Sequence, residues 1–188
     1  MIDSKETGWI QTFTGKKFYP MQPDPEDVCI EDIAHALSNL CRFNGHCKIG
    51  FYSVAQHSVL VSNHVPFCDA AWGLLHDAAE AYLIDLPRPV KQWLRKSGIT
   101  VFDTIEKQIM EAIRERFALS AKEPDSIKRL DQMLLATESR DIMSPLHPDW
   151  RIRKENGYEC LNEQIIPWHP VSAENAFLEA AVAVGIRR

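Results

Sequence analysis

The stretch 70–91 constrains the fold and the chemistry of this chain more than any other part of the sequence. An apolar run over 70–75 indicates a buried helix, and His76 and Asp77 stand side by side directly after it. Burying an ionisable pair is costly unless its members meet opposite charge or bind a metal. Successive helix residues point about 100° apart, so both side chains can reach one ion from neighbouring directions. We therefore expect a metal site near the end of a central helix that spans 69–82.

Two acids and a base follow this pair. Glu80 comes four residues after His76 and three after Asp77, which places it on the same helix face one turn further along. Asp85 precedes a helix-breaking Leu-Pro-Arg-Pro segment that leads to Lys91. Two carboxylates and a cation beside a metal are the parts of a site that hydrolyses phosphate esters.

Length and composition indicate one globular domain over 1–188, with a core at about 28–143. The chain has 188 residues, of which 45% are apolar and 25% are charged, as is usual for a domain that buries a core. Its net charge of −5 argues against a general nucleic-acid-binding surface, so we expect no nucleic acid polymer as a partner. No apolar run reaches the ~18 residues that a membrane-spanning helix needs, so we expect no membrane partner.

The N-terminus and the cysteines indicate a cytoplasmic protein. The first residues are polar and do not form a signal peptide. The five cysteines include no C-x-x-C pair. We expect free thiols in a reducing compartment.

Hydrophobic periodicity predicts an all-α fold with a small N-terminal β-hairpin. Apolar residues alternate on both sides of Thr14-Gly15, which predicts a hairpin over 9–20. Ser53 is the expected N-cap of the second helix. A proline-rich ordered loop is expected over 144–170. Helical spacing of apolar residues predicts helices at 30–43, 51–65, 69–82, 88–96, 99–117, 124–143 and 172–184.

Further metal ligands come from two other predicted helices. His57 lies in the helix before the central one, and a short connection should pack the two helices antiparallel. Asp131 is polar in an otherwise apolar helical run. Taken singly, each is more often a hydrogen-bonded structural group than a ligand. With His76 and Asp77, they would form a nitrogen and oxygen site for one divalent transition metal, Mn, Co, Fe, Ni or Zn, with Mg as a further candidate.

The order His57, His76-Asp77, Asp131 resembles the H…HD…D pattern of the HD-domain metal-dependent phosphohydrolases. The segments 76–80 and 85–91 are similar to those of bacterial HD-type deoxynucleotide 5′-nucleotidases. The segments 42–46 and 51–58 resemble a branch found in bacteria, prophages and phages, in which some phage members act on deoxynucleoside triphosphates, including dATP. The resemblance covers roughly 9–143.

This resemblance implies an HD-domain helical bundle and a set of site residues. It makes His57, His76, Asp77 and Asp131 the metal ligands. Glu80 and Asp85 share the positioning of water and the protonation of the leaving group, without a division of roles. Lys91 would hold phosphate as a point charge, and Arg42 matches the family's arginine near the phosphate and sugar. Phe43 stands where several deoxynucleotidases carry a tryptophan that senses the sugar, so the preference for deoxyribose is not carried over.

Ordinary structural roles remain open for several of these residues. Glu80 could instead be a solvated residue at a helix end, and Asp85 could instead cap the next helix. Lys91 has the alternative of a surface charge, and Arg42 that of an ion pair with Asp32 or Glu31. Phe43 and Tyr52 would either stack a base or pack in the core. His46, with Cys47 and Cys41 nearby, lacks the paired knuckles of a zinc site and is interpreted as structural.

The sequence therefore predicts a divalent-metal-dependent phosphohydrolase that removes phosphate from nucleotides, first of all deoxynucleoside 5′-monophosphates. One alternative is a deoxynucleoside triphosphate triphosphohydrolase. An alternative of another class is a non-catalytic HD scaffold that binds nucleotide. The helix at 99–117 and the alanine-rich C-terminal helix are candidate interfaces of a homo-oligomer.

Overall fold

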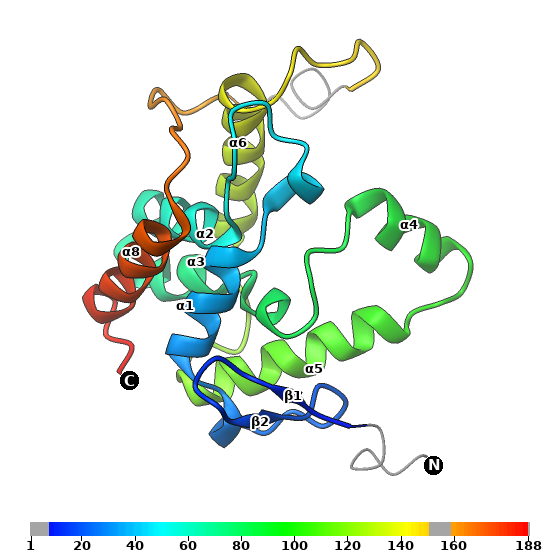
Figure 1. Ribbon diagram of the computed structural model, residues 1–188, viewed down its shortest axis with the longest axis vertical. Helices are drawn as coiled ribbons and strands as arrows, with labels where there is room; N and C mark the ends of the chain where they lie inside the picture. Colours follow the sequence, from blue (N-terminus) through cyan, green and yellow to red (C-terminus); the bar gives the residue numbers. More distant parts are fainter. Residues whose placement is uncertain (1–7, 151–158, 188) are drawn as a thin grey trace.

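Helices dominate the computed structural model, which describes residues 8–150 and 159–187 (Figure 1). A two-stranded antiparallel sheet near the N-terminus pairs β1 (Ile10–Gln11) with β2 (Lys17–Phe18). The predicted all-α fold with a small N-terminal hairpin is confirmed. The described helices are α1 (Ile30–Asn39), α2 (Val54–His64), α3 (Ala70–Leu75), α4 (Arg88–Lys96), α5 (Val101–Arg116), α6 (Asp125–Asp141) and α8 (Pro170–Ala183).

The hairpin is fastened to the helical body at two points. Gly15 takes a positive φ of 84° in its turn, a conformation that glycine adopts at little cost. Next to it, Thr14 donates from its backbone nitrogen and its hydroxyl to the buried carboxylate of Asp32 on α1, over 2.7 and 3.0 Å. From β2, the fully buried ring of Phe18 stacks on Tyr82 at a centroid distance of 3.8 Å. The hairpin therefore supports the segment that follows the His-Asp pair.

Helix α2 lies at the centre of the body. Ser53 caps its N-terminus by accepting a hydrogen bond from the Gln56 backbone nitrogen at 3.1 Å, as predicted. Helices α1, α3, α6 and α8 all pack against it (Figure 1). Helix α8 places the buried side chain of Phe177 in the main hydrophobic cluster. One face of α8 and one of α5 are buried inside the chain, and self-association through them stays a prediction.

The predicted central helix over 69–82 is wrong in one respect, because it breaks at the His-Asp pair. Helix α3 ends at Leu75, and Asp77 leaves the helical region with φ −103° and ψ 13°. A separate 3-10 turn, Ala78–Ala81, then packs against α1 and α5. Ala78 and Ala79 of this turn are both buried.

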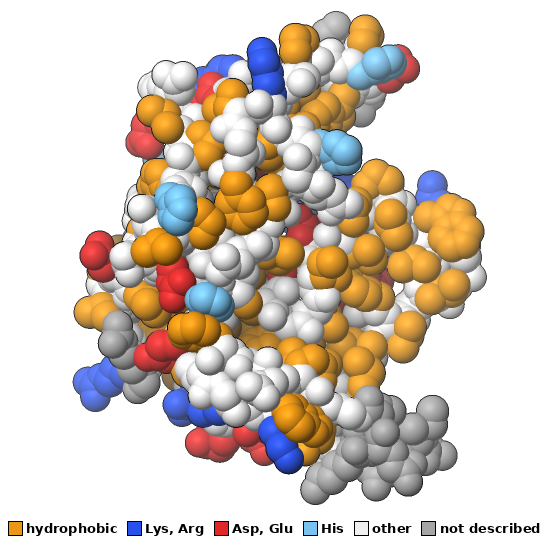
Figure 2. All heavy atoms as spheres, viewed as in Figure 1, with side chains coloured by type: hydrophobic (Ala, Val, Ile, Leu, Met, Phe, Trp, Pro, Cys, Tyr) orange, Lys and Arg blue, Asp and Glu red, His pale blue; other side chains and the backbone are white. Residues whose placement is uncertain are grey.

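Helix α4 buries no residue and projects from the body together with the start of α5 (Figure 1). Two ion pairs tie it to α5: Lys91 Nζ lies 2.7 Å from Glu106 Oε1, and Arg95 Nε lies 2.6 Å from Asp103 Oδ2. Hydrophobic side chains cover much of this projection on the face shown in Figure 2. Trp93 of α4 is exposed. Acidic side chains are visible in the hollow between the projection and the body.

Within the described residues, the predicted loop over 144–170 has no helix or strand before α8, and 151–158 lies outside them. None of the described helices combines the length and apolar character needed to cross a membrane.

Candidate metal centre and active site

Two imidazoles from different helices face each other in the centre of the molecule. His57 is fully buried on α2, and His76 follows the last residue of α3. His76 Nδ1 lies 2.8 Å from the Gly73 carbonyl oxygen, and His57 Nδ1 lies 2.6 Å from Glu138 Oε1. Both Nε2 atoms are buried and lack a hydrogen bond. When Nδ1 carries the hydrogen, Nε2 keeps its lone pair, which is the tautomer that binds a metal.

Two carboxylates approach these nitrogens. Asp131 Oδ1 on α6 lies 3.4 Å from His57 Nε2. Asp77 Oδ2 lies 3.2 Å from His76 Nε2 and 3.8 Å from His57 Nε2. One ligand atom from each of His57, His76 and Asp131 falls within 4.8 Å of the others, so this group could hold a metal ion. Asp77 lies beside the group and offers a second carboxylate.

The local electrostatics favour a cation at this point. Burial alone would lower the pKa of His76, but the charge of Asp77 outweighs it and raises that pKa to about 9. Burial opposes ionisation of Asp131, yet His57 and Arg42 hold its pKa down at about 2. The pKa of Asp77 is also lowered, by His76, His57 and Arg42 against the effect of burial. Two ionised carboxylates therefore draw positive charge to the imidazoles, and a divalent ion would satisfy the same demand.

Glu138 is a central residue of the site that the sequence analysis missed. It lies seven residues after Asp131, on the same face of α6 two turns further along, and it is fully buried. Its Oε1 accepts from the Tyr52 hydroxyl at 2.9 Å as well as from His57. Tyr52 is itself fully buried in this contact, which excludes the base-stacking role considered for it. The seven-residue spacing from a predicted ligand was the available signal.

Arg42 lies beside Asp77 and Glu138, and its role as a phosphate contact stays a prediction. It begins a 3-10 turn, Arg42–Gly45, and its Nη1 is 3.5 Å from Asp77 Oδ2. Its Nη2 is 3.3 Å from Glu138 Oε2. The Nε atom is buried and has no hydrogen-bond partner. A buried unsatisfied donor is costly, so this N–H is free for an acceptor such as a phosphate oxygen.

The residue after Arg42 has a strained backbone. Phe43 and Asn44 take positive φ values of 54° and 51°, which non-glycine residues adopt infrequently outside functional segments. The guanidinium of Arg42 lies 5.5 Å from the centroid of the Phe43 ring. Phe43 thus adjoins the anion-facing arginine, and its contact with a sugar or base stays a prediction.

Glu80 is partly buried among charged groups, close to Asp77 and Asp85. Its Oε2 is buried and has no hydrogen-bond partner. Burial raises its pKa to about 9, and the negative charges of Asp77 and Asp85 act in the same direction. This position rules out the solvated helix end as an account of Glu80. A carboxyl group with this pKa holds its proton to a higher pH than a solvated glutamate does.

Asp85 and Lys91 lie on the side of α4. Asp85 does not cap this helix, because Pro87 occupies the N-cap and no side chain bonds there. Burial raises the pKa of Asp85, while Arg42 acts in the opposite direction. Lys91 is largely covered, through its ion pair with Glu106, and is not a solvated surface charge. Its predicted contact with phosphate would therefore compete with Glu106.

No family model matches this chain. The chain is 40% identical over 172 residues to the uncharacterized protein YfdR of Escherichia coli strain K12, and the match covers 91% of the chain and 92% of YfdR. The chain belongs to the YfdR family. It is also 36% identical over 129 residues to the uncharacterized protein RCAP_rcc00048 of Rhodobacter capsulatus, with 64% of each chain covered. Neither name states an activity, so the chemistry of this YfdR-family chain follows from its own residues.

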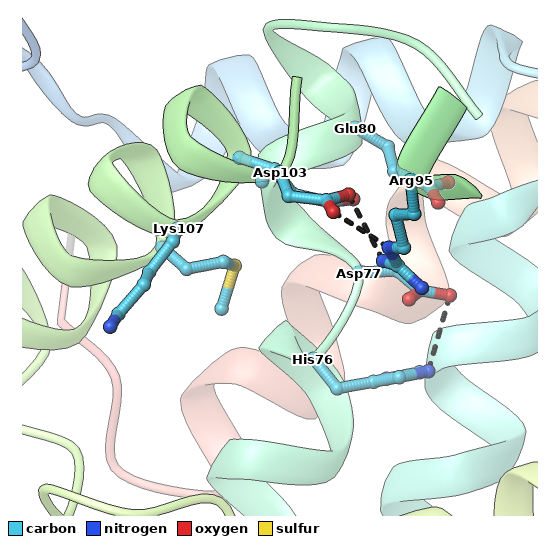
Figure 3. A pocket seen from close by; sticks show the side chains of 9 residues that line it. His76, Asp77, Glu80, Arg95, Asp103 and Lys107 are labelled. Carbon is cyan, nitrogen blue, oxygen red and sulfur yellow. Dashed lines mark hydrogen bonds and ion pairs between the residues drawn. The ribbon is translucent and has the colours of Figure 1, made fainter. Parts of the chain in front are cut away.

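A cavity of about 430 Å³ opens beside the metal group of this YfdR-family protein. Its size is in the range of small-molecule sites. In Figure 3, His76, Asp77 and Glu80 point toward one another on one side, and Arg95 reaches across to Asp103. Two basic residues that the sequence analysis missed, Arg95 and Lys107, come from α4 and α5. Their α4 and α5 positions carry no local sequence signal for this site, because only tertiary packing brings them to it.

The weaker metal candidates lie elsewhere. His46 is exposed, and Cys41 and Cys47 are half-buried free thiols. The one group in the described part of the chain that meets the geometry of a metal site contains none of them. His35 bonds to Glu174 on α8 at 3.1 Å and so belongs to the helix packing.

Proposed function

We propose that this protein is an HD-type, divalent-metal-dependent phosphohydrolase that removes phosphate from nucleotides, with deoxynucleoside 5′-monophosphates as the first candidates. One observation carries the proposal: two buried Nε2 atoms without hydrogen bonds, on His57 and His76, face two ionised carboxylates. The order of these residues along the chain, with their meeting in space, supports the HD-type assignment.

The donor set fits a metal ion. His57, His76, Asp77 and Asp131 would hold it, and two nitrogens with two carboxylates favour Mn, Co, Fe, Ni or Zn over Ca. When bound, such an ion supplies a Lewis acid that polarises a phosphoryl oxygen and makes water more acidic.

The remaining residues bind the substrate and move protons. Arg42 donates to a phosphate oxygen through its free Nε–H and orients the ester. Water attacks phosphorus as the bond from phosphorus to the ester oxygen breaks. Glu80 gives its proton to that leaving oxygen, since its high pKa keeps it protonated. Asp85 takes the proton that the attacking water loses, so the products are a nucleoside and inorganic phosphate.

A second candidate reaction is the hydrolysis of deoxynucleoside triphosphates. The cavity continues from His76 and Asp77 to Arg95 and Lys107. Arg95, which is paired with Asp103, would meet a phosphate chain that extends beyond the first phosphate.

A phosphate-release screen tests both reactions. Chelator-treated protein is supplied with Mn, Co or Mg and offered ribo- and deoxyribonucleoside mono-, di- and triphosphates, and each product is identified by chromatography. Release of nucleoside and phosphate from monophosphates is the expected result. Consumption of triphosphates alone would favour the second reaction. Bound metal without turnover of any nucleotide would contradict both and favour a nucleotide-binding scaffold.

A further inference from the structure

Glu138 lies outside the group that could hold a metal, yet it contacts His57 of that group. It is fully buried, and the ligand atoms that lie within 4.8 Å of one another come from His57, His76 and Asp131. Three side chains direct polar hydrogens at its two oxygens. Oε1 is 2.6 Å from His57 Nδ1 and 2.9 Å from the Tyr52 hydroxyl, and Oε2 is 3.3 Å from Arg42 Nη2.

We propose that Glu138 is a positioning residue that ties the metal ligand His57 to the anion-binding Arg42. One buried carboxylate then sets the geometry in which a metal and a phosphate meet. The inference rests on the proposed function, because it takes His57 as a ligand and Arg42 as a phosphate contact.

The contact with His57 sets the state of the ring. Tyr52 and Arg42 both donate to Glu138, so its oxygens act as acceptors and His57 Nδ1 must carry the hydrogen. The Nε2 lone pair is then directed at the space between Asp131 and Asp77. Without this acceptor, the imidazole loses the bond that selects its tautomer and its rotation.

Glu138 remains an ion-pair partner of Arg42 when a metal binds, because Glu138 is not a candidate ligand. Arg42 has two acidic partners, Asp77 at 3.5 Å and Glu138 at 3.3 Å. Asp77 is a candidate metal ligand, so its charge would be shared with the ion once a metal binds. Glu138 contacts the other terminal nitrogen of Arg42 and keeps the guanidinium in place, with Nε–H still free for phosphate.

The opposing interpretation is that Glu138 only satisfies buried donors in the core. Both interpretations predict some loss of stability on substitution. They differ in whether metal affinity, the tautomer of His57 and the coupling to Arg42 change.

The test compares Glu138→Gln with Tyr52→Phe in the full chain. Glutamine keeps the size of the side chain but replaces one acceptor oxygen by a donating NH2 group, so it cannot accept from both His57 and Arg42. Tyr52→Phe is the matched control, since it removes one donor from the same buried carboxylate and leaves the contacts with His57 and Arg42. Glu138→Asp keeps the negative charge but moves the carboxylate back by one methylene. This variant replaces Glu138→Gln in the test if the glutamine variant does not fold.

Cobalt affinity is measured first, by competition with a chelator. Glu138→Gln should weaken cobalt binding about 10–100-fold, the usual cost of losing the partner of a ligating histidine. Tyr52→Phe should leave cobalt affinity unchanged. The cobalt affinity of Glu138→Asp should lie between those of Tyr52→Phe and Glu138→Gln. Equal cobalt affinity in wild type and Glu138→Gln, or in wild type and Glu138→Asp, would overturn the role at His57.

Inorganic phosphate binding to the cobalt-loaded protein then tests the link to Arg42. Glu138→Gln and Arg42→Gln should each weaken phosphate binding, and the double variant should bind no more weakly than Arg42→Gln alone. Additive losses would overturn the link, because they mean that the two residues act independently.

A metal-free measurement separates this inference from the proposed function. Imidazole ¹⁵N shifts at alkaline pH report which nitrogen of His57 carries the hydrogen. The wild type should show Nδ1–H alone, and Glu138→Gln a mixture of tautomers. Wild-type protein that binds no cobalt would contradict the proposed function, while an unchanged tautomer in Glu138→Gln would contradict the positioning role.

Discussion

The imidazole rings of His57 and His76 lie 5.3 Å apart between their centroids and are tilted by 49° to each other. Each ring has its Nδ1 engaged with an oxygen and its Nε2 free of hydrogen bonds. The two histidines therefore have the same hydrogen-bonding arrangement, and their Nε2 atoms lie in the same part of the site. Carboxylate oxygens of Asp131 and Asp77 lie 3.4 and 3.2 Å from these nitrogens, so the group could hold a metal ion.

Replacing one of these rings should remove the metal. His76→Ala deletes a nitrogen ligand, and we expect cobalt or manganese affinity to fall by more than about 100-fold, beyond the cost of losing an outer partner alone. The matched control is His46→Ala, which removes an exposed histidine. Metal content of the purified variants after dialysis provides the readout. If His76→Ala retained its metal, the proposed ligand set would be wrong.

Replacing Glu80 should separate catalysis from metal binding. Glu80→Gln keeps the shape of the side chain but has no proton to give to the leaving oxygen. We expect kcat to fall about 10²–10⁴-fold, as for loss of a general acid, with metal content unchanged. Glu115→Gln, an exposed change on α5, serves as the control. Full activity in Glu80→Gln would contradict the role of Glu80 as proton donor and assign that role to another group.

The same substitution should stabilise the metal-free protein in a pH-dependent way. Burial raises the pKa of Glu80 from 4.5 to about 9. A carboxyl group with a raised folded-state pKa favours folding below its unfolded pKa, and this contribution is lost as the pH rises through the folded value. The Tm of Glu80→Gln should therefore exceed that of wild type by a margin that grows between about pH 5 and pH 9. Thermal melts of chelator-treated protein at several pH values measure the margin, and a constant difference would mean that Glu80 is solvated.

Gly73 should tolerate no side chain. A Cβ at this position would lie 3.0 Å from the Ser62 backbone Cα and 3.1 Å from Val65 Cγ2. Gly73→Ala must push α3 away from α2, and overpacking of this kind costs about 1–3 kcal/mol. Because the Gly73 carbonyl also holds His76 Nδ1, both the Tm and the cobalt affinity should fall. An unchanged Tm would show that the two helices separate freely.

Local signals in the sequence identified most of the elements. Proline and Ser97-Gly98 bound α4 at both ends, and the predicted range 88–96 matches Arg88–Lys96. The N-cap at Ser53 was readable because it depends only on the next three residues. Asp131 and His57 could be proposed as ligands because each is polar within an apolar helical pattern.

Other features depended on contacts between distant segments. The break after Leu75 has no proline or glycine to announce it, and it follows from packing the Ala78–Ala81 turn against α1 and α5. An ion pair with Asp32 or Glu31 was the structural alternative for Arg42, but it forms ion pairs with Asp77 and Glu138, at the Arg42–Gly45 turn.

The sequence by itself determined the helical periods, the hairpin and the types of residue available for chemistry, since these arise from neighbours along the chain. Only the tertiary structure decided which polar groups lost water and met one another. Glu138 shows the difference, because its sequence position reads as an ordinary helical acid while its burial beside His57 and Arg42 makes it part of the site. Desolvation and hydrogen bonding act through space, so their effects on Glu80 and Glu138 appear only once the helices are packed.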